Sequence, residues 1–288
     1  MAKQILCSEK EIKEVEKRPE EARKFCQALE RGDILFFPNI PFRFPQEDIA
    51  FLLAQKQTAN TGRKNIAYKP HRDTITNLIS ADLTKEDKDT FLKIMRNYSY
   101  NVEGFLGNFL SPYRAGWKLD YASFRPVQEK GRNLRKRARY DLLHVDAFPS
   151  RPVHGARILR FFTNINPEDP RKWITADTFS ELMDRFKEEP FCQALKERTS
   201  YDEFMLQLHH FLKEEENYQK NCPKQYWDFP PNSCWAVFTD GLTHAALEGK
   251  YALEQTFLIS NKALLEPKSA PVSILESFSH QTLIHQGF

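Results

Sequence analysis

The heptapeptide Leu142-Leu143-His144-Val145-Asp146-Ala147-Phe148 contains an imidazole and a carboxylate two residues apart. If it forms a β-strand, His144 and Asp146 share one face, because side chains alternate along a strand. A second histidine, His244, lies far downstream in a segment that also reads as a strand. Two histidines and one carboxylate form the facial triad typical of non-heme Fe(II) sites. The alternative for His144 and Asp146 is a hydrogen bond between the two side chains.

The composition indicates a globular protein of the cytoplasm. The 288 residues are 41% hydrophobic, and no apolar run approaches the roughly 20 residues that span a bilayer. Residues 1–17 lack the apolar block of a signal peptide. The five cysteines, an odd number without a C-x-x-C pair, favour a reducing compartment over a disulfide framework or zinc knuckle. A net charge of +3 gives no overall field that would favour nucleic acid.

The first 110 residues are predicted to be mainly helical. Ser8 and Glu11 match a capping box, which predicts a helix start. A second helix is expected from about Pro19 to Arg31, because proline is tolerated in a first helical turn. Residues 33–37 predict a short buried strand, and residues 62–68 a polar loop. Thr84 is expected to cap a long helix.

Beyond Gly116 the pattern becomes that of a β protein with a helical insertion. Apolar and alternating segments predict strands at 117–125, 156–166, 226–229, 233–238, 241–247 and 251–259. Short helices are expected over roughly 177–217, and Ser200 with Glu203 caps the last of them. Candidate metal ligands on strands before and after this insertion favour a double-stranded β-helix, or jelly roll. A doubly wound α/β sheet fits less well, because no glycine-rich phosphate loop is present.

The predicted fold class is therefore α+β, with a jelly-roll core wrapped by N-terminal and inserted helices. We expect residues 1–288 to form a single domain. Within it, residues 1–110 form the helical wrapping and residues 111–262 the core, with the insertion at about 177–217. Residues 263–288 form a C-terminal extension.

A basic run precedes the His144 segment. Its members are Lys130, Arg132, Arg135, Lys136, Arg137 and Arg139. Such a run is either a solvated loop or a site that attracts an anion such as phosphate or a lipid head group.

The segment Leu142-Leu143-His144-Val145-Asp146-Ala147-Phe148-Pro149-Ser150-Arg151-Pro152 resembles the signature of the Kdo hydroxylases. These are Fe(II)/2-oxoglutarate dioxygenases that act on 3-deoxy-D-manno-oct-2-ulosonic acid (Kdo) in lipopolysaccharide. Short stretches elsewhere resemble the same family in the same order, over most of the chain after about residue 60. They lie at 64–66, 123–127, 157–160, 163–167, 201–202, 206–209, 218–219, 239–240, 244–246 and 253–257.

The resemblance implies an enzyme that hydroxylates C3 of Kdo in a Kdo–lipid A precursor. His144, Asp146 and His244 would hold Fe(II), with 2-oxoglutarate and O2 as co-substrates. The protein would be cytoplasmic and at most peripheral on the cytoplasmic face of the inner membrane. No nucleic-acid partner is expected.

The distal carboxylate of 2-oxoglutarate requires a cation when it is buried. The wider superfamily often places an arginine or lysine on the strand after the last histidine, where this chain has Glu254, Gln255 and Thr256. Arg160, inside an apolar strand, is the predicted replacement. The alternative for Arg160 is a buried ion pair with Glu254 or Asp240. Gln255 and Thr256 are predicted to add neutral hydrogen bonds to the co-substrate.

Other polar residues beside apolar strands or loops are candidates for binding the sugar. They are Lys64, Asn65, Arg125 and Asn164, each with structural hydrogen bonding as the alternative. His209 is assigned instead to the packed face of a helix.

Two other functions remain open from the residues alone. A metal-dependent β-helix enzyme of another class, such as a cupin-like isomerase, would need the metal without 2-oxoglutarate. A non-enzymatic protein would bind nucleic acid or an anionic membrane through residues 130–139. Succinate release that depends on substrate would favour the dioxygenase over the first alternative, and RNA binding that survives loss of His144 would favour the second.

Overall fold

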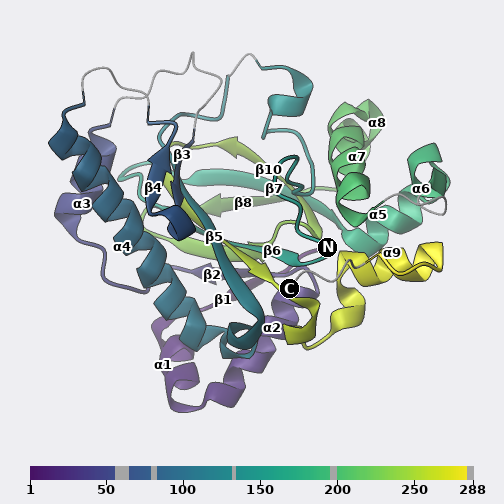
Figure 1. Ribbon diagram of the computed structural model, residues 1–288, viewed down its shortest axis with the longest axis horizontal. Coiled ribbons are helices and arrows are strands. Elements are labelled where there is room, and N and C mark those ends of the chain that lie inside the picture. The colour runs from purple at the N-terminus through teal and green to yellow at the C-terminus, as the bar shows by residue number, and fades with distance from the viewer. Residues whose placement is uncertain (56–64, 79–82, 132–133, 195–199, 284–288) are drawn as a thin grey trace.

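The computed structural model describes residues 1–55, 65–78, 83–131, 134–194 and 200–283 (Figure 1). Within these ranges, eight strands form a large sheet in the order β1-β2-β9-β6-β11-β5-β3-β4, and three form a smaller sheet in the order β10-β7-β8. The first pair is parallel and every other pairing is antiparallel. The large sheet consists of β1 (Gln4–Leu6), β2 (Ile34–Phe37), β3 (Ile66–Lys69), β4 (Thr74–Thr76), β5 (Trp117–Arg125), β6 (Arg157–Asn164), β9 (Cys234–Phe238) and β11 (Ala252–Ile259). The small sheet consists of β7 (Arg171–Thr178), β8 (Gln225–Phe229) and β10 (Leu242–Glu248).

The two sheets face each other across a cluster of aromatic rings. Trp235 of the large sheet stacks on Phe229 of the small one, with ring centroids 3.9 Å apart, and meets Trp173 at 5.6 Å. Phe162 stacks on Trp235 from within the large sheet. Aromatic burial of this kind is the main force that holds two sheets together. The arrangement confirms the predicted α+β fold with a double-stranded β-helix core.

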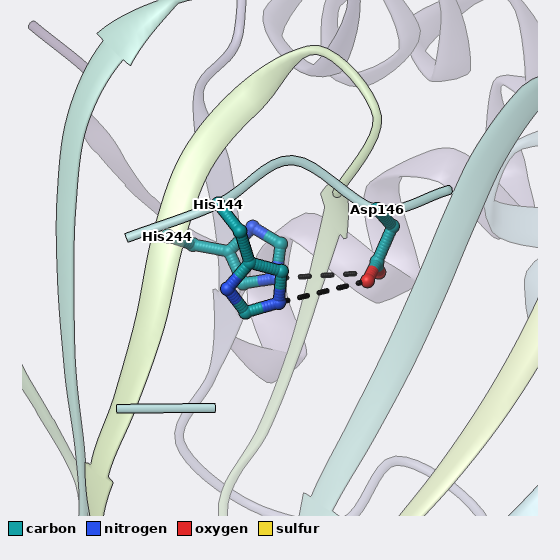
Figure 2. A group of neighbouring side chains, drawn as sticks. All are labelled: His144, Asp146 and His244. Atoms are coloured by element: carbon teal, nitrogen blue, oxygen red, sulfur yellow. Dashed lines mark ion pairs between the residues drawn. The ribbon is translucent and has the colours of Figure 1, made fainter. Parts of the chain in front are cut away.

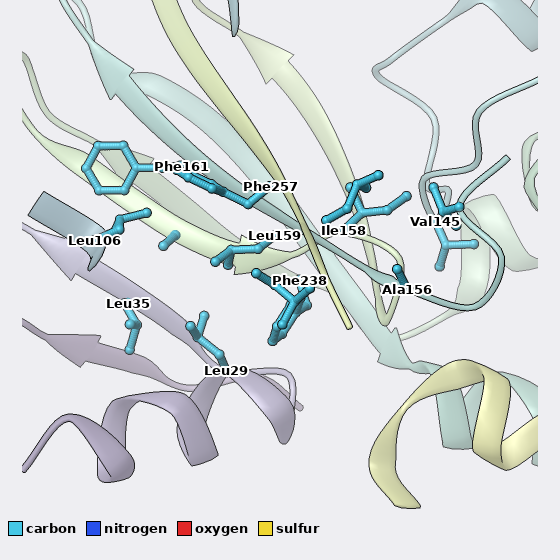
Figure 3. Close-up of a cluster of buried hydrophobic side chains, with 14 of the residues drawn as sticks. Leu29, Leu35, Leu106, Val145, Ala156, Ile158, Leu159, Phe161, Phe238 and Phe257 are labelled. Atoms are coloured by element: carbon cyan, nitrogen blue, oxygen red, sulfur yellow. The ribbon is translucent and has the colours of Figure 1, made fainter. Parts of the chain in front are cut away.

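The other face of the large sheet is covered by helices from the first part of the chain. Successive residues point to opposite faces of a strand, so Phe161 packs on this side while Phe162 packs between the sheets. Figure 3 shows the helix-side cluster, which extends from Leu29 of α2 and Leu106 of α4 to Phe161 and Phe257 of the sheet. The helices before the core are α1 (Glu9–Lys17), α2 (Ala22–Glu30), α3 (Gln46–Leu53) and α4 (Lys85–Phe109).

The predicted helical insertion is confirmed. It consists of α5 (Phe179–Phe186), α6 (Pro190–Ala194), α7 (Tyr201–Glu214) and α8 (Glu216–Asn221), and α9 (Pro271–Ser279) follows the core. The capping boxes expected at Ser8 and Ser200 are formed. Thr84 caps the long helix α4 as expected, and it does so in a capping box with Asp87. Among the described helices, none is both long enough and apolar enough to cross a bilayer.

Three local features differ from what the sequence predicted. The first 110 residues also contribute β1, β3 and β4, and β3 forms where a polar loop was expected. Strand β7 was not predicted, although it carries the buried Trp173 and Ile174. The His144 segment is not a strand, since its ladder contact is a single bridge with His244. Beyond His144 the backbone moves away from β10, and the N–H of Asp146 donates to the carbonyl of Thr239. The segment therefore has no continuous partner strand among the described residues.

Candidate metal centre and adjoining cavity

Two segments distant in sequence bring the three predicted metal ligands together (Figure 2). The backbone N–H of His144 donates to the carbonyl of His244 at 3.1 Å, and the reverse bond is 3.0 Å long. Two residues on, the N–H of Asp146 donates to Thr239 at 2.8 Å, at the turn that leads into β10. One ligand atom from each of His144, Asp146 and His244 lies within 4.8 Å of the others, and all three residues are buried. The structure therefore assembles the predicted triad, although its first part is not a strand.

The hydrogen bonds of the imidazoles orient them for metal binding. Nδ1 of His144 donates to the carbonyl of Leu142 at 2.7 Å, and Nδ1 of His244 donates to Leu242 at 3.0 Å. Each Nε2 is thus left with its lone pair, 3.8 and 4.0 Å from the oxygens of Asp146. Burial lowers the pKa of both histidines, which keeps the rings neutral and able to act as ligands. Such bonding of the distal nitrogen is the usual support of a metal-binding histidine.

The carboxylate of Asp146 also suits a cation. Burial alone would raise its pKa, but the positive charge of Arg160 lowers the pKa to about 2. Oδ2 lies 2.8 Å from Nε of Arg160 in an ion pair, yet neither atom has an aligned hydrogen bond within the described residues. A buried carboxylate oxygen without a hydrogen bond, facing two imidazole lone pairs, is the donor set that a non-heme Fe(II) ion requires.

Aromatic side chains enclose the triad. Trp173 of β7 stacks on His244 at 5.2 Å between centroids, and His209 of α7 meets His144 edge-on at 5.1 Å. Nδ1 of His209 donates to the carbonyl of Val145 at 2.7 Å, and burial lowers its pKa to about 4. The interpretation of His209 as only a packed helix face is therefore too narrow, because the ring also lines the cavity beside the triad.

A cavity of about 360 Å³ opens next to Asp146. Its floor is formed by the large sheet, through side chains of β5, β6 and β11, and one wall by α7. The volume falls within the usual range for small-ligand sites.

A buried charge network lies in the floor. Glu254 accepts from NH1 of Arg160 at 2.7 Å, from Nε of Arg125 at 3.1 Å and from the hydroxyl of Thr256 at 2.8 Å. Burial would raise the pKa of Glu254, but Arg160 and Arg125 lower it to about 2. The structure thus contains the ion pair between Arg160 and Glu254, whereas Asp240 pairs with Arg157 at 2.8 Å. Arg160 nevertheless lines the cavity, as a co-substrate ligand would have to.

The side chains of β11 alternate between the two faces of the large sheet, which separates the residues predicted to bind the co-substrate. Thr256 lines the cavity beside Glu254. Gln255 points to the opposite face, where its amide donates to the carbonyls of Asp120 and Thr256 and accepts from Ser99. Both amide hydrogens of Gln255 are therefore committed within the fold.

The candidates for sugar binding are also divided. Asn65 and Arg125 line the cavity. Asn164 is fully buried and donates to the carbonyls of Asp169 and Phe229, so its amide serves the fold at the end of β6. Lys64 lies outside the described residues.

Four cavity residues that were assigned no binding role from the sequence share a helical spacing. Leu206, His209, His210 and Lys213 of α7 all line the cavity and follow an i, i+3, i+4, i+7 stripe. Two histidines and a lysine on one such stripe were a signal in the sequence, but nothing local indicated that this face would meet the triad.

The basic run is largely neutralised by nearby carboxylates. Lys130 pairs with Glu248, Lys136 with Glu216, Arg137 with Glu214 and Arg139 with Asp141. Arg132 lies outside the described residues. The pairs favour the solvated-loop interpretation over a dedicated anion site.

Comparison with known proteins identifies relatives of this chain. Residues 12–282 match the family described as 3-deoxy-D-manno-oct-2-ulosonic acid (Kdo) hydroxylase. No curated protein sequence matches significantly. Crystal structures of the Kdo hydroxylase KdoO, a non-heme Fe(II) α-ketoglutarate-dependent dioxygenase, are similar over nearly the full length. The complex with α-ketoglutarate and Fe(III) is 32% identical, with a TM-score of 0.83 over 99% of both chains. The cobalt(II) complex is 32% identical, with a TM-score of 0.84 over 99% of this chain and 98% of the other.

Proposed function

Because the chain belongs to the Kdo hydroxylase family, as its sequence predicted, we propose that it hydroxylates C3 of the Kdo residue in a Kdo–lipid A precursor. The observation that carries this proposal is the buried triad of His144, Asp146 and His244 at the edge of a cation-lined cavity. Family membership decides against the two alternatives, a cupin-like enzyme without 2-oxoglutarate and a non-enzymatic binder.

The triad would hold Fe(II). When bound, Fe(II) with 2-oxoglutarate and O2 supplies the oxidation, which yields succinate and CO2 and adds one hydroxyl to the substrate. The chain itself keeps both imidazoles neutral by burial and keeps Asp146 ionised through Arg160. The stacking of Trp173 on His244 and the edge contact of His209 with His144 restrict the rotation of the ligand rings and exclude water from them.

Arg160 and Thr256 are the proposed ligands of 2-oxoglutarate. Both line the cavity, and Arg160 contacts Asp146 as well, so a carboxylate bound there would lie close to the metal. Since Arg160 is already paired with Glu254, the co-substrate would join an existing charge network. Gln255 would act indirectly, by fixing β11 against Asp120.

Asn65 and Arg125 are the proposed ligands of the sugar, because both reach the cavity from the large sheet. A second hollow of about 300 Å³ shares Phe148, Pro149 and Leu206 with the first and gives room for the rest of a larger acceptor. A lipid-linked acceptor resides in a membrane, so we place the enzyme in the cytoplasm as a peripheral protein of the inner membrane. One buried cluster extends from Cys7 to Leu283, which supports a single domain.

A turnover experiment tests the proposal. The purified chain, supplied with Fe(II), 2-oxoglutarate, air and a Kdo–lipid A precursor, should add one oxygen to Kdo and release an equal amount of succinate, both measured by mass spectrometry. Asp146→Asn should abolish the product and most metal binding. Asp141→Asn is the matched control, because Asp141 lies in the same segment but pairs with Arg139. Succinate release without oxidised sugar, or full turnover by the Asp146 variant, would contradict the proposal.

A further inference from the structure

Lys213 occupies the wall of the cavity near the C-terminal end of α7. The residue is only 2% exposed, although lysine is rarely buried without a partner. Its Nζ donates to the carbonyl of Arg137 at 3.0 Å and lies 5.4 Å from the centroid of the Tyr140 ring. These are neutral partners, and neither balances the charge of the ammonium group.

The cations that line the cavity differ in how their charge is balanced. Each of the four arginines there has a carboxylate partner: Glu254 for Arg125 and Arg160, Glu214 for Arg137 and Asp120 for Arg151. Lys213 forms no ion pair with a carboxylate of the described ranges, and its Nζ bonds to a carbonyl instead. Lys213 is thus distinguished from the other cavity cations by the lack of such a partner in the part of the chain that the structure describes.

Burial of the charged ammonium group without a counter-ion is unfavourable in free energy, and a nearby anion would make it less so. Burial lowers the pKa of Lys213 to about 8, against the opposing influence of Asp146 and Asp141. The group therefore remains mostly protonated at neutral pH. An anionic ligand in the cavity would supply the missing counter-charge and gain a charge-assisted hydrogen bond.

The substrate class has an anion at the required place. In 3-deoxy-oct-2-ulosonic acid the C1 carboxylate is attached to C2, the direct neighbour of the C3 methylene that the enzyme is proposed to hydroxylate. When C3 faces the metal, the carboxylate must lie within the same cavity. Arg160 is already assigned to 2-oxoglutarate, and Arg125, a proposed ligand of the sugar, already has Glu254 as its counter-charge. Lys213 is therefore the cavity cation whose charge the sugar carboxylate would balance.

We propose that Lys213 binds the C1 carboxylate of the acid sugar and thereby makes the enzyme specific for an acidic acceptor. This inference rests on the proposed function and specifies which residue contacts the substrate. 2-Oxoglutarate also carries carboxylates, so the test must distinguish binding of the sugar from binding of 2-oxoglutarate.

The experiment compares Lys213→Met, which keeps the apolar stem, with Lys213→Arg, which keeps the charge. Lys220→Met is the control, because it removes a lysine charge from the exposed surface of α8. We expect Lys213→Met to raise the KM for the acidic acceptor about ten- to a hundredfold, the range of a lost hydrogen bond to a charged group. The KM for 2-oxoglutarate should stay unchanged, Lys213→Arg should recover most of the loss, and Lys220→Met should match the wild type.

A second arm uses the wild-type protein with an acceptor whose C1 carboxyl is reduced to an alcohol. The kcat/KM of wild type should be about tenfold or more higher for the acid than for the alcohol, whereas the two values should be similar for Lys213→Met. Equal use of both acceptors by wild type would overturn the inference without relying on any variant. A rise in the KM for 2-oxoglutarate alone in Lys213→Met would assign the lysine to the co-substrate and overturn it as well.

A binding measurement separates this inference from the proposed function. A Kdo glycoside is titrated calorimetrically into the Fe(II)- and 2-oxoglutarate-loaded protein without O2. Tight binding by wild type and weak binding by Lys213→Met would support the inference even if no hydroxylation occurs, in which case the proposed function fails alone. Equal affinity of the two proteins would overturn the inference while leaving the hydroxylase activity to its own test.

Discussion

Arg160 connects the metal centre to the charge network in the cavity floor. Its Nε lies 2.8 Å from Oδ2 of Asp146, and its NH1 lies 2.7 Å from Oε1 of Glu254. The same guanidinium therefore keeps a proposed metal ligand ionised and faces the space proposed for 2-oxoglutarate. A single substitution at this residue should affect both functions.

Replacing Arg160 by methionine should weaken 2-oxoglutarate binding by roughly 2–5 kcal/mol, because a buried carboxylate loses its charged partner. Metal affinity should fall as well, since Asp146 loses its contact with the guanidinium. Arg160→Lys keeps the charge but lacks the planar fork and should bind the co-substrate more weakly than wild type. Anaerobic titrations with 2-oxoglutarate and with cobalt(II) measure the two effects separately.

Arg125→Met is the matched control for this prediction. It also removes a partner of Glu254, but Arg125 has no ion pair with Asp146 among the contacts of the described residues. Its metal affinity should therefore stay near that of wild type. An Arg160→Met protein with normal half-saturation by 2-oxoglutarate would move the anchor to another residue.

The turn between β9 and β10 positions both segments that carry the proposed metal ligands. The carbonyl of Thr239 accepts the N–H of Asp146, and β10 begins shortly afterwards with His244 as its third residue. Asp240 is held by Arg157 in a fully buried ion pair. At Gly241, an added Cβ would collide with NH2 of that arginine. The turn thus needs glycine for a close approach.

Gly241→Ala should destabilise the fold by about 1–3 kcal/mol through overpacking. It should also weaken metal binding, because the displaced turn carries the partner of Asp146. Urea unfolding and cobalt(II) titration measure the two effects. Gly104→Ala is the control: it lies in the interior of α4 with no atom within 4 Å of the added Cβ, and it should stabilise by roughly 0.5–1 kcal/mol. Unchanged stability of Gly241→Ala would show that Arg157 can move aside at no cost.

The protein buries charged side chains next to the aromatic rings that lie between its two sheets. The rings between the sheets lie next to the network of Arg125, Glu254 and Arg160, and Arg125 is within 6.0 Å of the Phe162 ring. Burial raises the pKa of Glu254, but the two arginines together lower it to about 2. The ionised form of Glu254 is therefore favoured by folding.

This shift predicts how stability depends on pH. A carboxyl whose pKa is lower in the folded state contributes stability that is present above its unfolded pKa of about 4.3. The contribution should be lost as the pH falls from there towards about 2. Urea unfolding of wild type at pH 7, 4.5 and 3 should show the loss between the last two values.

Glu254→Gln should be less stable at pH 7, because two buried arginines lose their counter-charge. It should also lose less stability than wild type between pH 4.5 and 3, since it has no carboxyl at this position to protonate. An identical loss in both proteins would show that other groups cause the acid sensitivity.

Local sequence patterns were enough to predict the family and most of the core strands. The His144-x-Asp146 motif, His244 and the ordered short motifs indicated the family, which profile and structure comparisons confirm. The core strands β5, β6 and β8–β11, the capping boxes of α1 and α7 and the Thr84 cap of α4 were also predicted. These features depend on local periodicity or on residue types at short spacing, both of which are visible in a linear chain.

Which segments meet in space could not be predicted from the sequence. The His144 segment is irregular because its two hydrogen-bonding partners belong to β10 and to the turn before it. The carboxylate that pairs with Arg160 was left open between Glu254 and Asp240. The structure pairs Arg160 with Glu254 and also with Asp146, a partner that the sequence did not indicate. Lys213 lines the cavity because α7 packs beside it, a contact that the sequence did not indicate. Pairing of distant strands and of buried charges is set by long-range packing, which short-range sequence patterns do not encode.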